Sequence, residues 1–458
     1  MYSASSASLS NRLDDFSIDI LINPRIMDLR NTCSYFSEVN DMERVILHCD
    51  ANSYYASVEC LYTPQIREKP VAVGGDVAAR HGIILTKNPL AKSFGVKTGE
   101  PIWQAKQKCP GLVCVPPDFP LYMRFSQRMR KLYESYSDRV EPFGLDEAWL
   151  DLSGRGVTLR DGARIADEIR RRVKNELGIT ISVGVANNKV FAKLGSDMKK
   201  PDAVTALYPE NYARQVAPLS AGELLYVGPS TQRRLASIGV YTIGDLARCS
   251  ETLLTRLLGK NGALLKAYAS GSDTSTVMPC THTRAIQSVG NSTTPPRDLE
   301  NAEDVRCLCY LLAESVCARL RDGGFRAQCV QFSLRNSQLV TRSVQTTLTR
   351  PSSLTDEISA AAFSLFEKNF STGFPYRSIG LSCSRLSPDN LPIQLDFTGC
   401  EMQRLRQEKL ERSIDGLRRR FGHGIVTRGV VLSQRELLSP VEEHIAQPMR
   451  SFTGKEGA

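Results

Sequence analysis

The segment Gly144-Leu145-Asp146-Glu147-Ala148-Trp149-Leu150-Asp151 places two adjacent carboxylates where a glycine-marked turn meets an apolar, β-prone run. Much earlier, the run Val45-Ile46-Leu47-His48-Cys49-Asp50 also leads an apolar stretch into a carboxylate. Side chains at the ends of strands converge on a cleft rather than on a core. We therefore expect Asp50, Asp146 and Glu147 to lie together, with catalytic and metal-binding roles.

These three acids offer the hard oxygen ligands that Mg²⁺ prefers, and they leave coordination positions for substrate phosphates. Two such ions about 3.5–4 Å apart activate an attacking oxygen and stabilise a leaving oxygen in phosphoryl transfer. A solvated β-turn is the alternative, because Asp and Glu beside Gly are common at hairpin tips. The two adjacent acids alone do not separate these interpretations.

The length of 458 residues predicts three or four domains, and 41% hydrophobic residues suffice for their cores. A formal charge of +9 favours a polyanionic partner, although surplus lysine for solubility would give the same value. The 13 cysteines show no CxxC pair and no Cys/His pattern with zinc spacing. Buried free thiols in a reducing compartment, without a structural metal, are therefore expected.

The sequence gives no sign of a membrane protein. It contains no apolar run of roughly 18 residues, and its Ser-rich start lacks the basic-then-apolar order of a signal peptide. We expect a cytoplasmic monomer. Residues 1–41 show no pattern, so Met42 is interpreted as the functional start.

A first βαββαβ unit is predicted around the acids. A strand ends at Asp50, a turn leads into a short helix with Tyr54 and Tyr55, and strands are expected near 139–143 and 148–152. A helix with one apolar face ends at a glycine, and the alternating run 179–185 closes the unit. Its apolar positions are Ile165, Ile169, Val173 and Leu177. This order is ferredoxin-like. The two tyrosines would either floor a sugar pocket or serve as core aromatics.

Two further segments carry features suited to phosphate. The insertion 64–118 is predicted to be a small α/β unit with a basic edge that includes Lys87 and Lys92; a triphosphate or plain solvent would suit that edge. Residues 218–273 should be helical, with glycines such as Gly228 and Gly239 exposing backbone N–H groups to DNA phosphates. A plain helical linker domain is the alternative.

A second βαββαβ unit without converging acids is predicted beyond a linker at 272–296. Arg335, Arg342 and Arg350 should lie near its open sheet face, which would grip a duplex. Scattered arginines on a solvated sheet are the alternative. The tail should contain a charged helix from about 401 to 420.

Together, these stretches resemble the Y-family, or translesion, DNA polymerases, most closely the bacterial DNA polymerase IV type. The resemblance covers about Arg44 to Pro388 and rests on 48–59, 145–151 and 191–201 in this order. It implies an α+β multidomain fold with the following parts: an N-terminal extension (1–43), a palm (44–63 and 119–217), fingers (64–118), a helix-hairpin-helix thumb (218–275), a little finger (276–388) and a tail (389–458).

The resemblance also implies roles for residues that match the family's motifs. Asp50, Asp146 and Glu147 would be the metal ligands, joined by the main-chain carbonyl of Ala51. Tyr55 would be the steric gate, whose ring clashes with a ribose 2′-OH, and Lys200 would contact the triphosphate. The segment Gln394-Leu395-Asp396-Phe397 is similar to the sliding-clamp-binding peptide of bacterial polymerases.

Two departures from the family pattern are visible. Family members often carry a tyrosine and an arginine on the fingers, where this chain has Pro89 and Lys92. Lysine keeps the charge but not the planar fork, and Lys87 could compensate. In the clamp-binding segment, the usual second apolar residue before the aromatic Phe397 is missing.

The sequence therefore predicts a template-directed, two-metal, Mg²⁺-dependent DNA polymerase that uses primer-template DNA and dNTPs and lacks proofreading. The resemblance to the family implies lesion bypass in DNA repair. One rival is a catalytically weak paralogue that grips DNA and recruits repair partners. Another is a nucleotide cyclase, which shares paired acids on a βαββαβ sheet. The three retained acids argue against the first rival, and the basic second sheet module argues against the second.

Overall fold

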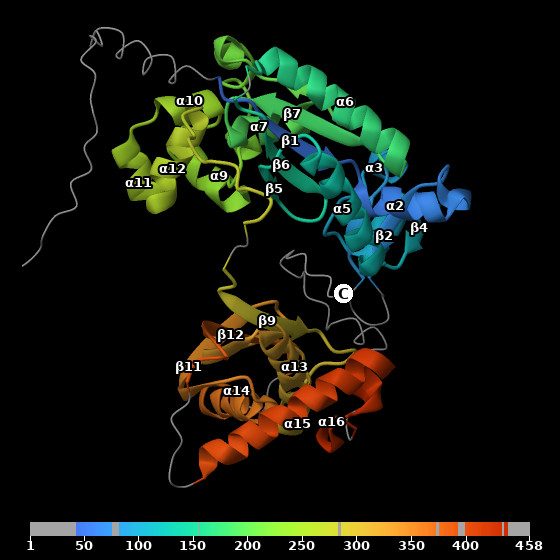
Figure 1. Cartoon of the computed structure of the whole chain (residues 1–458), viewed down its shortest axis with the longest axis vertical. Helices are drawn as coiled ribbons and strands as arrows, with labels where there is room; N and C mark the ends of the chain where they lie inside the picture. The colour runs from blue at the N-terminus through green and yellow to red at the C-terminus, as the bar shows by residue number, and fades with distance from the viewer. Residues whose placement is uncertain are drawn as a thin grey trace, which may run out of the picture.

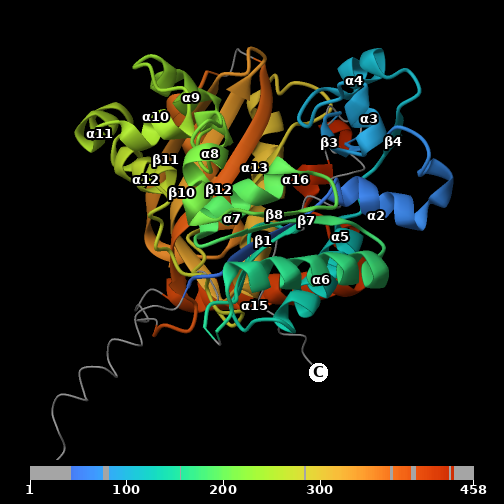
Figure 2. The same ribbon diagram turned by 90° about the horizontal axis from the view of Figure 1, so that it is seen from above.

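The computed structural model describes residues 43–75, 82–154, 156–282, 285–371, 375–392, 399–432 and 435–437. Within these ranges the chain forms three sheets and the helices packed on them. In Figures 1 and 2 the fingers (64–118) and the thumb (218–275) lie on opposite sides of the palm (44–63 and 119–217). The little finger (276–388) lies below the palm in Figure 1.

The palm sheet has the strand order β5-β6-β1-β7-β8. Only the β7–β8 pair is parallel; β1 pairs antiparallel with both β6 and β7, and β5 with β6. Taken in chain order with the helices, the first four of these strands give the predicted ferredoxin-like unit. The strands are β1 (Ile46–Ala51), β5 (Val140–Pro142), β6 (Glu147–Asp151), β7 (Ile181–Ala186) and β8 (Val204–Ala206).

The two faces of the palm sheet have different coverings. Leu47, Cys49 and Leu150 pack under α5 (Phe119–Glu134) and α6 (Leu159–Leu177) in one large core. The opposite face, which carries His48 and Asp50, is covered by α7 (Lys189–Met198). As predicted, α6 ends at Gly178, whose φ of 72° is left-handed. At its other end, Thr158 and Asp161 cap the first turn.

Gly184 on β7 lets α7 approach the sheet closely. A Cβ atom at this position would lie 1.9 Å from the Ala192 carbonyl oxygen and 2.4 Å from the Ser196 nitrogen. Any larger residue would therefore push α7 away from the strands. Since α7 carries Lys193, this glycine also sets how near that lysine comes to the acids on β1 and β6.

The fingers and thumb are built on opposite sides of the palm. The fingers begin with the short 3₁₀ helix η1 (Pro64–Ile66). They continue with β2 (Val71–Gly74), β3 (Ile84–Lys87), α3 (Pro89–Ser93), α4 (Ile102–Lys108) and β4 (Val113–Val115), and the sheet order is β3-β2-β4. The palm helix α2 spans Tyr54–Tyr62. The thumb contains the helices α9 (Pro229–Ala236), α10 (Ile243–Arg248), α11 (Glu251–Leu258) and α12 (Lys260–Ala269), and the short helix α8 (Tyr212–Gln215) precedes it at the end of the palm. Short 3₁₀ turns occur at η2 (Pro209–Asn211) and η3 (Ala221–Glu223).

The little finger is a four-stranded antiparallel sheet of order β11-β10-β12-β9 with α13 and α14 on one face. Its elements are β9 (Ser288–Thr293), α13 (Ala302–Asp322), β10 (Phe325–Asn336), β11 (Thr341–Ser352), α14 (Thr355–Asn369) and β12 (Tyr376–Pro388). The element order is βαββαβ, as predicted. The prediction of a linker at 272–296 is wrong for residues 288–293, which form β9. This strand has little apolar pattern in its sequence and is held by its pairing with β12.

The tail contains the predicted charged helix, α15 (Cys400–Phe421), followed by η4 (His423–Ile425), α16 (Gly429–Leu432) and η5 (Arg435–Leu437). It packs against the little finger, since the buried Arg321 of α13 pairs with Glu411 and, at 2.7 Å, with Asp415. In Figure 1, α15 runs diagonally across the lower part of the little finger, beside α13 and α14.

Candidate active site

Antiparallel pairing of β1 with β6 brings the predicted acids together. Asp50 lies directly opposite Glu147 in the strand register, and His48 lies opposite Trp149. Opposed residues point to the same side of a sheet, so Asp50, Glu147 and His48 share the face that α7 covers. The ligand atoms of His48, Asp50 and Glu147 all lie within 4.8 Å of one another.

Two lysines supply the positive charge at this cluster. The Lys193 ammonium lies 3.0 Å from Asp50 Oδ2 and 2.9 Å from Glu147 Oε2. Lys200 lies 2.7 Å from Asp50 Oδ1, and both lysines also contact Asp197, at 3.3 and 2.8 Å. Asp50 and Glu147 thus converge on one cationic group in the structure.

The pKa values follow from this arrangement. Burial would raise the pKa of Glu147, but contact with His48 and the charge of Lys193 lower it to about 2. Burial would lower the pKa of Lys193, but the charges of Asp50, Glu147 and Asp197 raise it overall. Burial lowers the pKa of His48 against the pull of Glu147. Glu147 is therefore ionised at neutral pH and ready to bind a cation.

Asp146 lies beside the cluster but differs from its members in position and in pKa. It precedes β6, and its carbonyl oxygen accepts a hydrogen bond of 3.0 Å from the Ala51 backbone N–H. Burial, together with the charges of Asp50 and Glu147, raises its pKa to about 6. It is not one of the three residues whose ligand atoms gather within 4.8 Å. Asp146 is therefore the acid that most needs added positive charge to ionise.

The adjacent tyrosines have different surroundings. Tyr55 is half-buried and stacks on Tyr122 with ring centroids 4.4 Å apart and an interplanar angle of 16°. Tyr54 is 3% exposed, and its hydroxyl donates a 2.6 Å hydrogen bond to the Tyr122 carbonyl. Tyr54 is therefore a core aromatic, contrary to its predicted contact with nucleotide, while Tyr55 keeps an accessible ring beside the acids.

The lysines of the fingers lie at the end of β3 and on α3. Lys87 donates a hydrogen bond of 2.8 Å to Thr98, and burial and the nearby charge of Lys92 lower its pKa. Lys92 is exposed. Between them, the buried Asn88 caps α3 by accepting from the Ala91 N–H and ties it to β2 through the Val71 N–H. Asn88 was not predicted as a site residue.

The residues predicted to contact DNA are split between two surfaces. Gly228 and Gly239 are exposed at the two ends of α9, and Gly239 has a left-handed φ of 78°. Arg335 lies on the open face of the little-finger sheet, as expected. Arg342 does not, because it lies opposite the core residue Leu334 and packs over the Phe370 ring at 5.3 Å.

Arg350 also departs from the prediction, since it pairs with the buried Glu401 of α15. The error has one physical cause, since strand register and the bulge near Ala327 decide which face a side chain takes. The predicted clamp-binding residues Gln394, Leu395, Asp396 and Phe397 lie outside the described residues.

Two contributors to the cluster were not predicted as site residues. His48 lies 3.2 Å from Glu147 Oε2 through Nε2 and 2.9 Å from the Ser196 hydroxyl through Nδ1. Lys193 approaches the acids only because α7 lies close to β7 over Gly184. The alternation of His48 and Asp50 on one strand was a signal for the first. The lysine-bearing helix that precedes Pro201 was a signal for an ammonium over this cleft, but it did not indicate which lysine would contact the acids.

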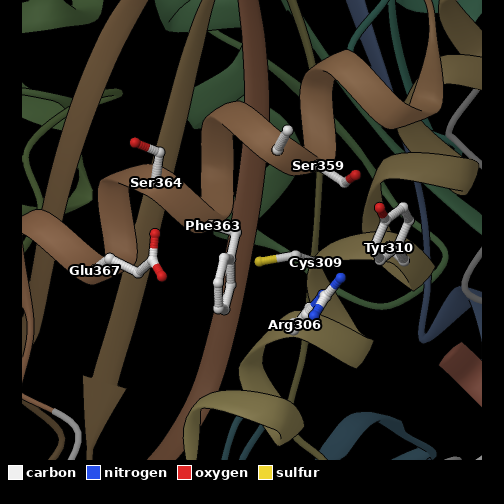
Figure 3. Close-up of a pocket in the computed structure, with 8 residues that line it drawn as sticks. Arg306, Cys309, Tyr310, Ser359, Phe363, Ser364 and Glu367 are labelled. Atoms are coloured by element: carbon white, nitrogen blue, oxygen red, sulfur yellow. The ribbon is translucent and has the colours of Figure 1, made fainter.

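The donor set fits a divalent metal ion. Asp50 and Glu147 offer carboxylate oxygens to one point, and Ala51 is the last residue of the strand that carries Asp50. Hard oxygen donors of this kind suit Mg²⁺. A hollow of about 330 Å³ lies elsewhere, between α13 and α14 around Phe363 and Tyr310 (Figure 3). The hollow has no pair of carboxylates, so it is not the catalytic site.

Comparison with known proteins identifies the family. The profile of the impB/mucB/samB family matches residues 49–197, and that of the family's C-terminal domain matches 286–397. DNA polymerase IV of Acetivibrio thermocellus is 48% identical over 396 residues, which cover 86% of this chain and 99% of that protein. DNA polymerase IV 1 of Bacillus subtilis is 36% identical over 394 residues, covering 86% of this chain and 94% of that one.

A solved structure shares the fold. A Y-family DNA polymerase chimera, Dbh-Dpo4(243-245)-Dbh, superposes with a TM-score of 0.66 at 23% identity, over 75% of this chain and 99% of the chimera. The chain belongs to the impB/mucB/samB family, the Y-family DNA polymerases of the DNA polymerase IV type. The predicted family, fold class and enzyme class, a DNA-directed DNA polymerase, are thereby confirmed.

Membership of this family implies that the enzyme requires a divalent metal and that its substrates are primer-template DNA and dNTPs. It also disfavours the non-catalytic paralogue. In the part of the chain that the structure describes, no helix has the length and apolarity needed to cross a membrane.

We predict that Asp146→Asn stabilises the metal-free protein at pH 7.5 by about 1–3 kcal/mol, because the ionised carboxylate is buried beside two acids. Below its unfolded-state pKa, Asp146 is protonated in both states and costs the folded state nothing. The cost appears as pH rises above that value and is complete once pH has passed the folded-state pKa of about 6. The advantage of the variant should therefore shrink as pH falls toward about 4. Urea denaturation in EDTA at several pH values measures it.

Glu210→Gln, a change at an exposed carboxylate of the palm, is the control and should alter stability by less than about 0.5 kcal/mol at either pH. A wild-type protein more stable than Asp146→Asn at pH 7.5 would contradict the raised pKa.

Proposed function

We propose that the chain is a Mg²⁺-dependent, error-prone translesion polymerase that adds dNTPs to a primer 3′-OH without proofreading, as a cytoplasmic monomer. The observation that carries this proposal is the direct opposition of Asp50 and Glu147 on paired strands, both directed at one cationic group. The proposal keeps the domain boundaries at 44–63 with 119–217, 64–118, 218–275, 276–388 and 389–458.

Asp50, Asp146, Glu147 and the Ala51 carbonyl would hold two Mg²⁺ ions. The ions would supply activation of the primer oxygen and charge neutralisation at the leaving pyrophosphate. The protein's own contribution is positioning and electrostatics. Strand pairing fixes Asp50 against Glu147, so little reorganisation of these acids is needed when substrate binds.

Three lysines would contact the negatively charged triphosphate from two sides. Lys200 contacts Asp50 and Asp197 in the structure, and burial notwithstanding, those carboxylates raise its pKa. It therefore stays protonated and would contact the triphosphate once the acids bind metal. Lys87 and Lys92 would bind the triphosphate from the fingers as point charges, without the bidentate geometry of an arginine.

DNA would be held without sequence readout. Gly228 and Gly239 are exposed near the ends of α9 and would let a DNA backbone approach closely, although the Gly239 N–H itself donates to the Ala236 carbonyl at 3.0 Å. The open sheet face of the little finger carries Gln331, Ser333 and Arg335 on β10. Small polar side chains allow a phosphate backbone to approach closely, and phosphate contacts position a duplex without specifying its sequence.

We predict that Glu147→Gln lowers primer extension by at least about a thousandfold, because it removes the charge that holds the cation while keeping the size of the side chain. Binding of primer-template DNA should change by less than about threefold, since the little finger and thumb are untouched. Single-turnover extension and fluorescence anisotropy give the two values.

Glu176→Gln, at an exposed carboxylate on α6, is the matched control and should extend primers like the wild type. If Glu147→Gln extended primers normally, a catalytic role for this acid would be excluded. Wild-type protein that binds DNA but never extends a primer would favour the non-catalytic alternative.

We predict that Tyr55→Ala raises ribonucleotide incorporation relative to deoxyribonucleotide incorporation by about ten- to a hundredfold, as expected when a clash of about 1–3 kcal/mol is removed. The ratio of kcat/KM for a dNTP and the matching rNTP measures the effect. Tyr54→Phe is the control, because its hydroxyl is used inside the core. Unchanged sugar selectivity in Tyr55→Ala would refute the gate.

We propose that Gln394-Leu395-Asp396-Phe397 docks on a bacterial sliding clamp, on the basis of sequence resemblance. Leu395→Ala with Phe397→Ala should abolish co-elution with the clamp and leave extension of short primers unchanged, since the apolar anchors of such a peptide carry its affinity. The exposed pair Leu253→Ala with Leu264→Ala on the thumb is the control for clamp binding. Normal co-elution of the 395/397 variant would disprove this docking segment.

A further inference from the structure

The helix α15 is amphipathic in the opposite sense to a typical surface helix. Three of its four acidic residues, Glu401, Glu411 and Asp415, are buried against the little finger, at 2%, 3% and 7% exposure, and the fourth, Glu408, is partly buried and pairs with Arg326. Its apolar residues Met402, Leu410, Leu417 and Phe421 face solvent, at 48%, 55%, 43% and 60% exposure. A helix that merely covered a core would place these two sets the other way round.

Ionic contacts anchor the inner face. Arg321 of α13 pairs with Glu411 and Asp415, and Arg404 of α15 pairs with Glu357 of α14 at 2.7 Å. Arg321 is itself buried, and its guanidinium also donates a hydrogen bond to the Ser353 carbonyl. Because each buried charge has partners, the rotation of α15 about its axis is fixed. The apolar stripe is therefore held outward by the same contacts.

The outer face combines apolar and basic residues. At about 100° per residue, Leu410, Leu417 and Phe421 fall within about 40° of one another on the helix, and with Met402 they extend over about 30 Å. Arg406, Lys409 and Arg420 are exposed beside them. None of the exposed residues of α15 is acidic, and no carboxylate among the described residues pairs with these three cations.

We propose that this outer face of α15, defined by Met402, Leu410, Leu417 and Phe421 with Arg406 and Lys409, docks an acidic amphipathic helix of a partner protein. An apolar stripe of this length matches the helix-in-groove and helix-to-helix modes of recognition. The surrounding cations select a partner whose apolar seam is flanked by Glu or Asp. The proposal is independent of the catalytic assignment.

Three other occupants fit less well. A second copy of this chain would bring the same unpaired cations together across a symmetric contact, which is unfavourable. DNA has no apolar surface along its backbone for Leu410 and Leu417, and the open sheet face lies on the other side of α13 and α14. The segment 438–458 contains both signs of charge and lacks an acidic heptad pattern.

The test uses a defined probe and the full chain. The probe is a fluorescein-labelled synthetic peptide of three heptads, with Leu at the a and d positions and Glu at the e and g positions. Anisotropy titration should give micromolar affinity that weakens as salt is raised. Leu410→Glu with Leu417→Glu, and separately Arg406→Glu with Lys409→Glu, should each weaken binding at least about tenfold.

The matched control is Leu253→Glu with Leu264→Glu, which places the same charges on the thumb at leucines of 43% and 41% exposure. It should bind the peptide as the wild type does, and a peptide with Lys in place of Glu should not bind. Primer extension by the 410/417 variant should be unchanged, which shows that the protein is folded.

Four results would overturn the proposal. The first is no binding of the Glu peptide at 100 µM, or binding insensitive to the α15 substitutions. The second is light scattering that shows a dimer lost in the 410/417 variant, which would assign the face to a second copy. The third is competition by duplex DNA or by phosphatidylserine vesicles that depends on the same residues. The fourth is at least tenfold tighter peptide binding after deletion of 438–458, which would assign the face to that segment.

Discussion

The palm depends on holding negative charges close together without separating the strands that carry them. Asp50 and Glu147 face each other across a pair of β-strands, and Asp146 directly precedes Glu147 in the chain. Coulomb repulsion among them would be large in a partly buried site. Lys193 offsets it by contacting Asp50 and Glu147 at 3.0 and 2.9 Å, while burial, and then the charges of Asp50 and Glu147, raise the pKa of Asp146. A site with this residual charge is suited to binding divalent cations.

The position of Lys193 follows from packing. The absence of a Cβ at Gly184 allows α7 to lie against β7, and the ammonium then reaches across to β1 and β6. A second support is the polar layer beneath the cluster, where His48 bridges between Ser196 of α7 and Glu147. The geometry of this cluster of acids and lysine is a property of the sheet and of α7 together.

The little finger uses buried charge in another way. Arg321 gathers Glu411 and Asp415 in a place that apolar side chains could have filled, and such an arrangement contributes little net stability. It does fix orientation, because a guanidinium bonded to two carboxylates tolerates little rotation of α15. The outward apolar stripe is the consequence, and it gives the tail a surface separate from both the palm and the open sheet face.

The sequence by itself determined the family, the βαββαβ order of the palm, the three acids and the helices α6, α14 and α15, because each leaves a local pattern of period, cap or motif. Only the tertiary structure decided which lysine of α7 contacts the acids, that Tyr54 is buried, which face of the sheet Arg342 takes, and that β9 exists. Each of those depends on a contact between segments distant in the chain: the approach of α7 over Gly184, the bond from Tyr54 to the Tyr122 carbonyl, the register of β10 with β11, and the pairing of β9 with β12. Local composition carries no record of such contacts, since side-chain direction in a strand reverses with every one-residue shift of register.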